Sequence, residues 1–225
     1  MEDRIKILKN NISTIYCNTS LKNDTTIHKL ANRLRTLEVR DNPDGIIMLD
    51  DNECIIIEHF EIDASKHTKK GSTAKRELGR ITRDWEKEHE LAKYSDSKEN
   101  LISSLVKLIN KHNKFDIYRD NLIKEQVINK ETIVHNILFI EDRTLLVGIK
   151  DNKYLNSCIL FDREILKILE EYTDIDYIIS INNHLLKMKE ACIIKNNDSD
   201  NYDCPEYDAM YFDSIVADMT FIKLD

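Results

Sequence analysis

Two apolar runs separated by two polar residues constrain the fold of this chain more than any other feature. Residues 45–50 (GIIMLD) and 53–63 (ECIIIEHFEID) are rich in isoleucine, and such runs are typical of β-strands. The Asp51-Asn52 pair between them is short enough to join two antiparallel strands directly. We therefore predict a β-hairpin from residue 45 to residue 63.

The rest of the chain alternates between helical and strand patterns. Apolar residues at helical spacing predict helices over 25–38, with Thr25 or Thr26 as its N-cap, and over 73–93, 97–111, 115–128 and 162–174. Continuous apolar runs predict further strands over 135–142, 144–149, 155–161, 175–181 and 214–224. Hairpin, helices and then alternating strand and helix predict an α/β fold in which a mixed β-sheet is flanked by helices.

Composition narrows the class of protein. A chain of 225 residues with 41% hydrophobic content can bury one sizeable core. The formal net charge of −8 gives no support for nucleic-acid binding by bulk electrostatics, although a local basic patch could still provide it. We find no signal-like N-terminus and no long apolar run, so we expect a cytoplasmic protein without a membrane span. The five scattered cysteines are expected to be free thiols.

Glu58 is the most unusual residue of the predicted hairpin. It directly follows three isoleucines and shares a strand face with Ile56 and Phe60, where a carboxylate is costly unless it is paired or bound to metal. Asp44 enters the neighbouring strand near its start, so we expect it close to Glu58. Two adjacent carboxylates repel and raise each other's pKa, and a divalent cation such as Mg²⁺ or Mn²⁺ removes that conflict.

This arrangement resembles the PD-(D/E)XK nuclease superfamily. There a helix precedes a hairpin whose first strand begins with Pro-Asp and whose second strand carries an acid, any residue and then lysine. Pro43-Asp44 matches the first half, and Glu58-His59-Phe60 matches the second, with phenylalanine in place of lysine. The preceding and following helices are in the family's order, so that the resemblance covers about residues 25 to 93.

The resemblance implies a restriction-endonuclease-like core over 1–132, with 133–225 continuing the same α/β domain. It implies that the carboxylates of Asp44 and Glu58 bind the metal and that the backbone carbonyl of His59 adds a ligand. The ion would polarise the scissile phosphate and lower the pKa of an attacking water. Glu38, at the end of the first predicted helix, matches a further acid of many members.

The missing lysine is expected from the basic segment after the hairpin, as in members that recruit it from elsewhere. Its candidates are Lys66, Lys69, Lys70 and Lys75, with Lys75 favoured by a place in the first turn of the next helix. Arg76, Arg80 and Arg83 form a stripe on that helix. With Lys69 and Lys70 they could track a phosphate backbone, or they could pair with interspersed acids on a solvated face.

The resulting hypothesis is a Mg²⁺- or Mn²⁺-dependent endo- or exodeoxyribonuclease, with DNA as its partner and RNA as a second possibility, in defence, mobile-element or repair contexts. The alternative is an inactive nuclease-like scaffold that serves as a binding or assembly module, which Phe60 in the lysine position favours. The C-terminal part could form the contact of a homodimer or a larger complex.

Other polar features have ordinary explanations. His59, Glu61 and Asp63 alternate with the Glu58 face and are expected on a wet outer face, with no zinc site. His112 shares a predicted helix face with Phe115 and Arg119, where it is expected to be a hydrogen-bonded packing residue. The acidic stretch 196–208 lacks the calcium-loop pattern and is expected to be a solvated loop.

Overall fold

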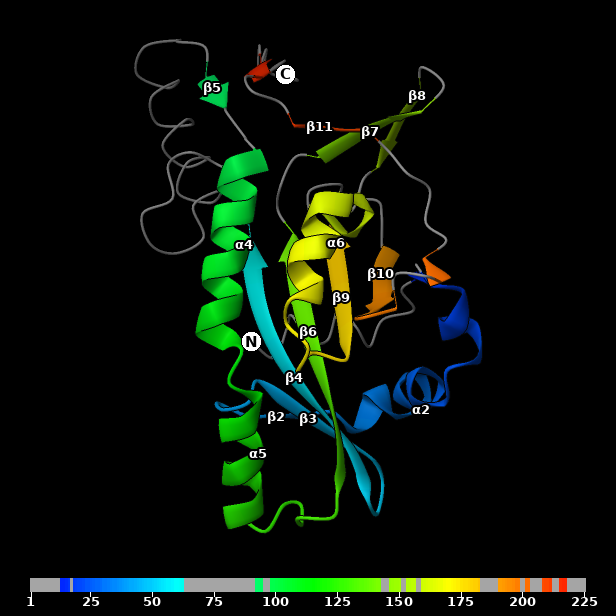
Figure 1. Cartoon of the computed structure of the whole chain (residues 1–225), viewed down its shortest axis with the longest axis vertical. Helices are drawn as coiled ribbons and strands as arrows, with labels where there is room; N and C mark the ends of the chain where they lie inside the picture. The colour runs from blue at the N-terminus through cyan, green and yellow to red at the C-terminus, as the bar shows by residue number, and fades with distance from the viewer. Residues whose placement is uncertain are drawn as a thin grey trace, which may run out of the picture.

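The computed structural model describes residues 13–16, 18–62, 92–94, 98–142, 146–150, 153–156, 159–182, 190–198, 201–202, 208–211 and 215–217. A seven-stranded mixed sheet forms its centre, in the order β1-β10-β9-β6-β4-β3-β2 (Figure 1). These strands are β1 (Ser13–Tyr16), β2 (Glu38–Val39), β3 (Gly45–Asp50), β4 (Glu53–Ile62), β6 (Ile133–Asp142), β9 (Tyr177–Asn182) and β10 (Glu190–Lys195). The predicted hairpin is β3 and β4, and the predicted α/β class with a mixed, helix-flanked sheet is confirmed.

The sheet has a parallel centre and antiparallel sides. β4, β6 and β9 run parallel to one another, and β4 keeps register with β6 along its whole length. β3 is antiparallel to β4, and β10 is antiparallel to β9. Parallel neighbours need long crossover connections, and helices occupy the ones between β4 and β6 and between β6 and β9.

Helices lie on both faces of the sheet (Figure 1). α4 (Lys98–His112), α5 (Phe115–Lys124) and α6 (Arg163–Glu170) cover one face, which we call the α4 face. α2 (Thr25–Arg33) covers part of the other, which we call the α2 face. Short 3-10 helices are η1 (Thr19–Asn23), η2 (Leu34–Thr36) and η3 (Ile159–Phe161).

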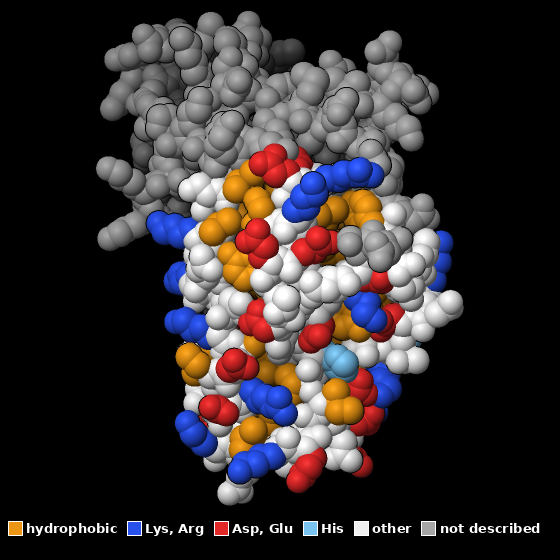
Figure 2. Space-filling view, viewed as in Figure 1, with side chains coloured by type: hydrophobic (Ala, Val, Ile, Leu, Met, Phe, Trp, Pro, Cys, Tyr) orange, Lys and Arg blue, Asp and Glu red, His pale blue; other side chains and the backbone are white. Residues whose placement is uncertain are grey.

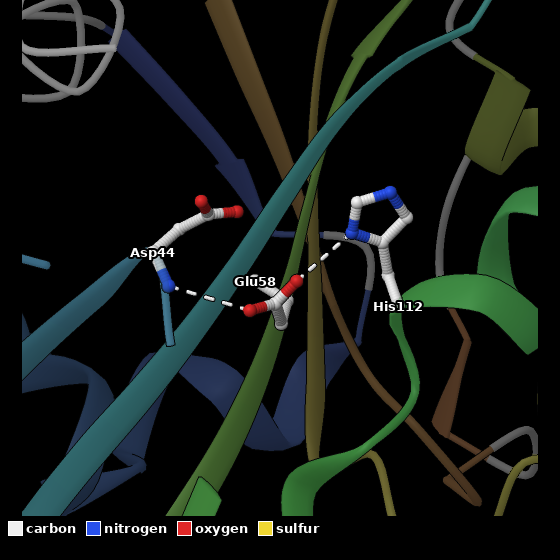
Figure 3. Close-up of side chains that lie close together, drawn as sticks. All are labelled: Asp44, Glu58 and His112. Carbon is white, nitrogen blue, oxygen red and sulfur yellow. Dashed lines mark hydrogen bonds and ion pairs between the residues drawn. The ribbon is translucent and has the colours of Figure 1, made fainter. Parts of the chain in front are cut away.

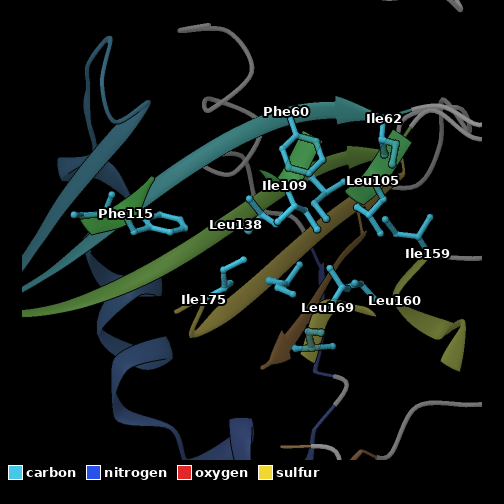
Figure 4. Close-up of a cluster of buried hydrophobic side chains, with 14 of the residues drawn as sticks. Phe60, Ile62, Leu105, Ile109, Phe115, Leu138, Ile159, Leu160, Leu169 and Ile175 are labelled. Atoms are coloured by element: carbon cyan, nitrogen blue, oxygen red, sulfur yellow. The ribbon is translucent and has the colours of Figure 1, made fainter. Parts of the chain in front are cut away.

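The sheet separates two hydrophobic clusters. On the α4 face, helix residues such as Leu105 and Ile109 pack onto Phe60 and Leu138 of the sheet (Figure 4). On the α2 face, Ile27 and Leu30 belong to a cluster with β-strand residues that include Ile57, Phe139 and Ile179. Both faces of β4 are therefore buried, as expected for a strand in the parallel part of a sheet.

Helix α2 differs from its prediction at both ends. Asp24, not Thr25 or Thr26, is the N-cap, because its side chain accepts a hydrogen bond from the Ile27 N–H. The α-helix ends at Arg33 and continues only as the 3-10 turn η2. The apolar residues of the predicted stripe still face the core. Leu37 is buried in the same cluster as Ile27 and Leu30, although it lies in an extended segment beyond the helix.

Smaller sheets replace some predicted elements. Ala92 and Lys93, predicted to end the helix over 73–93, belong instead to β5 (Ala92–Tyr94), which pairs with β12 (Ile215–Ala217). The rest of that predicted helix lies outside the described residues. A three-stranded sheet joins β11 (Asp208–Tyr211), β7 (Leu146–Lys150) and β8 (Lys153–Asn156).

The acidic stretch after β10 begins inside the protein. Asn196 is buried, and its Nδ2 donates to the carbonyl oxygens of Leu169 at 3.2 Å and Tyr172 at 2.9 Å. Asp198 accepts hydrogen bonds from Ser20 and Asn201. The prediction of a solvated loop was therefore wrong for its first residue, because the side-chain amide satisfies carbonyls at the end of α6.

Two further predictions concern the cysteines and membrane-spanning segments. Cys54 is a free, buried thiol, as predicted, and burial raises its pKa to about 11; Cys192 is also buried. In the described ranges, no helix has the length and apolar character that crossing a membrane requires.

Candidate metal centre

Asp44 is held in place by three hydrogen bonds just before β3. Its backbone carbonyl accepts from the Arg40 N–H at 3.1 Å, and its own N–H donates to Glu58 Oε1 at 3.3 Å. Its carboxylate oxygen Oδ2 accepts from the N–H of His59 at 2.9 Å. The backbone and the side chain of Asp44 are thus both tied to the neighbouring part of β4.

Gly45, the first residue of β3, follows this aspartate and packs closely on Leu37. It pairs with Ile57, and a Cβ atom at this position would lie 2.9 Å from Cδ1 of Leu37 and 3.7 Å from Cβ of Ile57. The pairing of β3 with β4 ends at Gly45 and Ile57, so β3 provides no backbone acceptor for the β4 residues that follow Ile57. The Asp44 carboxylate takes that place and satisfies the otherwise unpaired N–H of His59.

Glu58 lies on the α4 face of β4, as its alternation with Ile56 and Phe60 predicted, and only 3% of its surface is exposed. Oε1 accepts from the Asp44 N–H, and Oε2 lies 2.9 Å from Nδ1 of His112 (Figure 3). The two acids therefore converge from adjacent strands, as the sequence predicted, and a histidine from α4 joins them.

The three side chains satisfy the basic geometric requirement of a metal site. One oxygen of Asp44, one oxygen of Glu58 and one nitrogen of His112 all lie within 4.8 Å of one another. No other group of three such ligands is this close among the described residues. Asp44 and Glu58 are buried, whereas the His112 side chain is 21% exposed, so the histidine is the most exposed of the three.

The electrostatics of this cluster favour a cation. Burial raises the pKa of Asp44, and the charge of Glu58 raises it further, against the hydrogen bond from the His59 N–H. Two unit charges about 5 Å apart repel by about 3 kcal/mol at an effective dielectric constant of about 20. Within the described ranges, no lysine or arginine pairs with either acid. His112 can neutralise at most one of the two carboxylates.

Tyr118 of α5 lies near enough to the same pair of acids for their charges to act on its phenol. Burial raises the pKa of its phenol, and the Glu58 charge, a hydrogen bond to Glu58 and the Asp44 charge raise it further. The hydroxyl therefore stays protonated at neutral pH and acts as a donor toward Glu58. Its ring packs edge-on against Phe115, with centroids 6.2 Å apart, which sets the position of the hydroxyl.

His112 reaches the site because the helix ends there. α4 stops at His112 and α5 starts at Phe115, so the prediction that these two residues share one helix face with Arg119 was wrong. His112 follows Ile109 by three residues, on the side of α4 that packs on the sheet. Its ring lies against Phe60, with centroids 5.6 Å apart. It is a hydrogen-bonded packing residue, as predicted, and also a potential ligand.

Phe60 occupies the position where the resembled family has lysine, and it is buried in the core. The residues predicted to supply that lysine or to contact nucleic acid lie outside the described residues: Lys66, Lys69, Lys70, Lys75, Arg76, Arg80 and Arg83. Their roles stay predictions.

Glu38 and the His59 side chain lie away from the cluster. Glu38 belongs to β2, is largely exposed and pairs with Arg40 at 3.1 Å. The His59 side chain points to the α2 face, where Nε2 is 3.5 Å from Oε2 of Glu141 and both side chains are buried. The prediction of a wet outer face was therefore wrong for His59, whose ring packs on Phe139, while Asp63 lies outside the described residues. The predicted carbonyl ligand from His59 stays a prediction.

The surface around α4, α5 and α6 has no single sign of charge. Figure 2 shows acidic and basic side chains interspersed over the coloured part of this face. A basic tract for a nucleic-acid backbone is not evident on this face of the described residues, which agrees with the net charge of −8.

Comparisons with known proteins identified no relative of this chain. A scan against protein-family models, a search of curated proteins and a search of solved structures each found no match. The resemblance to the PD-(D/E)XK superfamily therefore depends on this chain's own residues, namely Pro43-Asp44 and Glu58-His59-Phe60.

Proposed function

We propose that this protein is a divalent-metal-dependent nuclease that hydrolyses phosphodiester bonds in DNA. The observation that carries the proposal is the convergence of two buried carboxylates, Asp44 and Glu58, with His112 within 4.8 Å. Carboxylate oxygens are the ligands of Mg²⁺ and Mn²⁺, and the residual negative charge of the cluster attracts such an ion. The order of elements around the pair supports phosphodiester hydrolysis through the family resemblance.

In this proposal the chain's own residues bind and orient. Asp44 and Glu58 hold the ion, which when bound polarises a phosphoryl oxygen and lowers the pKa of a water. The hydrogen bond from the His59 N–H fixes one oxygen of Asp44, and the Tyr118 hydroxyl restrains Glu58. The scissile phosphate would approach on the side of His112, the most exposed of the three side chains. The family's lysine role falls to a cation of the basic segment, Lys75 or Lys66.

The test is cleavage of supercoiled plasmid and of single-stranded DNA by the purified full chain with Mg²⁺ or Mn²⁺. Loss of a ligand is expected to reduce cleavage by about a hundredfold, the upper end of what second-shell changes already cost. Glu58→Gln and Asp44→Asn remove the charges with little change in shape. Glu141→Gln is the matched control, since it alters a buried glutamate on the other face of the sheet. Cleavage that survives both site substitutions unchanged would contradict the proposal.

A second candidate function is favoured by Phe60, which is buried where the family has its lysine. Under it the chain is an inactive nuclease-like scaffold that binds a partner. Calorimetric titration with Mn²⁺ separates the two candidates. Absent binding, or binding that is indifferent to Glu58→Gln, favours the scaffold, whereas binding that Glu58→Gln abolishes favours the nuclease.

A further inference from the structure

His112 is placed as a ligand of a metal ion would be. Its Nδ1 lies 2.9 Å from Oε2 of Glu58, and the three donor atoms of the cluster lie within 4.8 Å of one another. Ligands about 2.1 Å from one ion lie about 3 Å apart when they are adjacent and about 4.2 Å apart when they are opposite. The spacing of Nδ1 and Oε2 therefore fits two adjacent positions around one ion.

The packing around the ring keeps the nitrogen directed at the acids. The imidazole lies against Phe60, and Ile109 one turn earlier anchors the helix end in the core. Nδ1 is the ring nitrogen nearer the backbone, and it faces Glu58 (Figure 3). A metal ion held by Nδ1 of His112 and Oε2 of Glu58 would replace the hydrogen bond between them.

A nitrogen ligand changes which ion a site prefers. Mg²⁺ prefers oxygen ligands and retains several waters, whereas imidazole binds first-row transition ions more readily. A purely carboxylate site would accept Mg²⁺ and Mn²⁺ with little discrimination. Two carboxylate oxygens and one imidazole nitrogen would instead discriminate against Mg²⁺.

We propose that His112 is a direct ligand through Nδ1, and that it makes this centre selective for a first-row transition ion such as Mn²⁺ over Mg²⁺. The inference rests on the metal site of the proposed function and specifies its ion. The competing role of His112 is that of a counter-ion, which pairs with Glu58 only while no metal is bound. The two roles differ in what happens to selectivity when the imidazole is removed.

The experiment measures Mn²⁺ and Mg²⁺ binding to the full-length wild type and to His112→Ala by calorimetry, without DNA. We expect the wild type to bind Mn²⁺ more tightly than Mg²⁺ by about tenfold or more, and His112→Ala to lose about tenfold in Mn²⁺ affinity with little change for Mg²⁺. Electron spin-echo spectra of bound Mn²⁺ should show coupling to an imidazole nitrogen that disappears in the variant.

His135→Ala is the matched control. His135 is also half-buried and lies 2.9 Å from a glutamate, Glu53, but it is outside the cluster. It should leave both affinities and the nitrogen coupling unchanged. If His112→Ala does not fold, as judged by circular dichroism, His112→Gln and the wild-type spectrum decide the question.

Several outcomes would overturn the inference: no Mn²⁺ binding to the wild type, equal losses for both ions in His112→Ala, or bound Mn²⁺ without nitrogen coupling. DNA cleavage that is equally fast with Mg²⁺ and lacks that coupling would leave the proposed function standing and remove only this inference. Selective Mn²⁺ binding with nitrogen coupling but without DNA cleavage would leave this inference standing and remove the proposed function.

Discussion

On each side of β4 a histidine, a phenylalanine and a glutamate lie close together, with different results. On the α4 face, His112 packs on Phe60 and lies 2.9 Å from Glu58. This pair has a third donor, because Asp44 enters from the neighbouring strand. Its histidine is also partly exposed, at 21% of the side chain.

On the α2 face, His59 packs on Phe139, with ring centroids 5.0 Å apart, and lies 3.5 Å from Glu141. Glu61 stands in register beside Glu141, yet no three ligand atoms converge there among the described residues. The His59 side chain is only 6% exposed. Among the described residues, the His59–Glu141 pair therefore lacks the third donor that Asp44 provides to the pair on the α4 face.

The largest expected effect is the difference in Mn²⁺ affinity between substitutions of Glu58 and Glu141. Glu58→Gln should weaken Mn²⁺ binding by about a hundredfold, because it removes a ligand charge from the converging cluster. Glu141→Gln should leave that affinity within about twofold, since its pair lies across the sheet. Calorimetric titration of both variants measures the contrast, and an equal loss in both would mean that the two faces do not differ as described.

Asp44→Asn tests the third donor with a smaller effect. The amide oxygen can still accept the hydrogen bond from the His59 N–H, so the fold should be retained while the ligand charge is lost. We expect Mn²⁺ affinity to fall by about tenfold or more. Calorimetry measures the affinity and urea denaturation checks the fold; unchanged affinity would show that Asp44 only caps β4.

The pH dependence of stability tests the raised pKa of Asp44. Burial, followed by the Glu58 charge, raises the pKa of Asp44 above the ordinary value of 3.8. The folded protein thus holds this proton more tightly than the unfolded chain, so its stability falls as pH rises from 3.8 through the raised pKa. Metal-free wild type should lose stability relative to Asp44→Asn over this window.

Urea denaturation of both proteins in chelator, at a series of pH values, measures that difference. Above the raised pKa the gap between the two proteins should stay constant, and added Mn²⁺ should reverse it by binding only the wild type tightly. A gap that is independent of pH would contradict the raised pKa of Asp44.

Tyr118→Phe should have the smallest effect. It removes the hydroxyl that donates to Glu58 but keeps the ring on Phe115, so the free energy of unfolding should fall by about 1 kcal/mol. Metal affinity should stay within about threefold, because a restraint and not a ligand is lost. Tyr172→Phe, which removes a more exposed hydrogen bond to Asn110, is the control and should cost less. A loss of metal binding in Tyr118→Phe would instead place the phenol among the ligands.

Local sequence patterns predicted much of the fold and two residues of the candidate metal centre, Asp44 and Glu58. Isoleucine-rich runs around Asp51-Asn52 predicted β3 and β4, and helical spacing predicted α4 with its buried Leu105 and Ile109. The proximity of Asp44 to Glu58 was predicted from the hairpin, but its exact register was not, because a bulge between Met48 and Asp50 shifts the pairing by one residue from that of the two-residue turn. The boundary of α2 and the strand β5 were not predictable in this way, since both depend on neighbouring elements that override local preference.

By itself, the amino-acid sequence determined the hairpin and the two acids that it brings together, because short-range geometry needs no other part of the chain. Only the tertiary structure decided that His112, 54 residues from Glu58, completes the cluster, and that His59 is buried on the far face. The physical reason is that packing decides which faces are covered and where a helix end comes to lie, and both depend on contacts between segments distant in the chain.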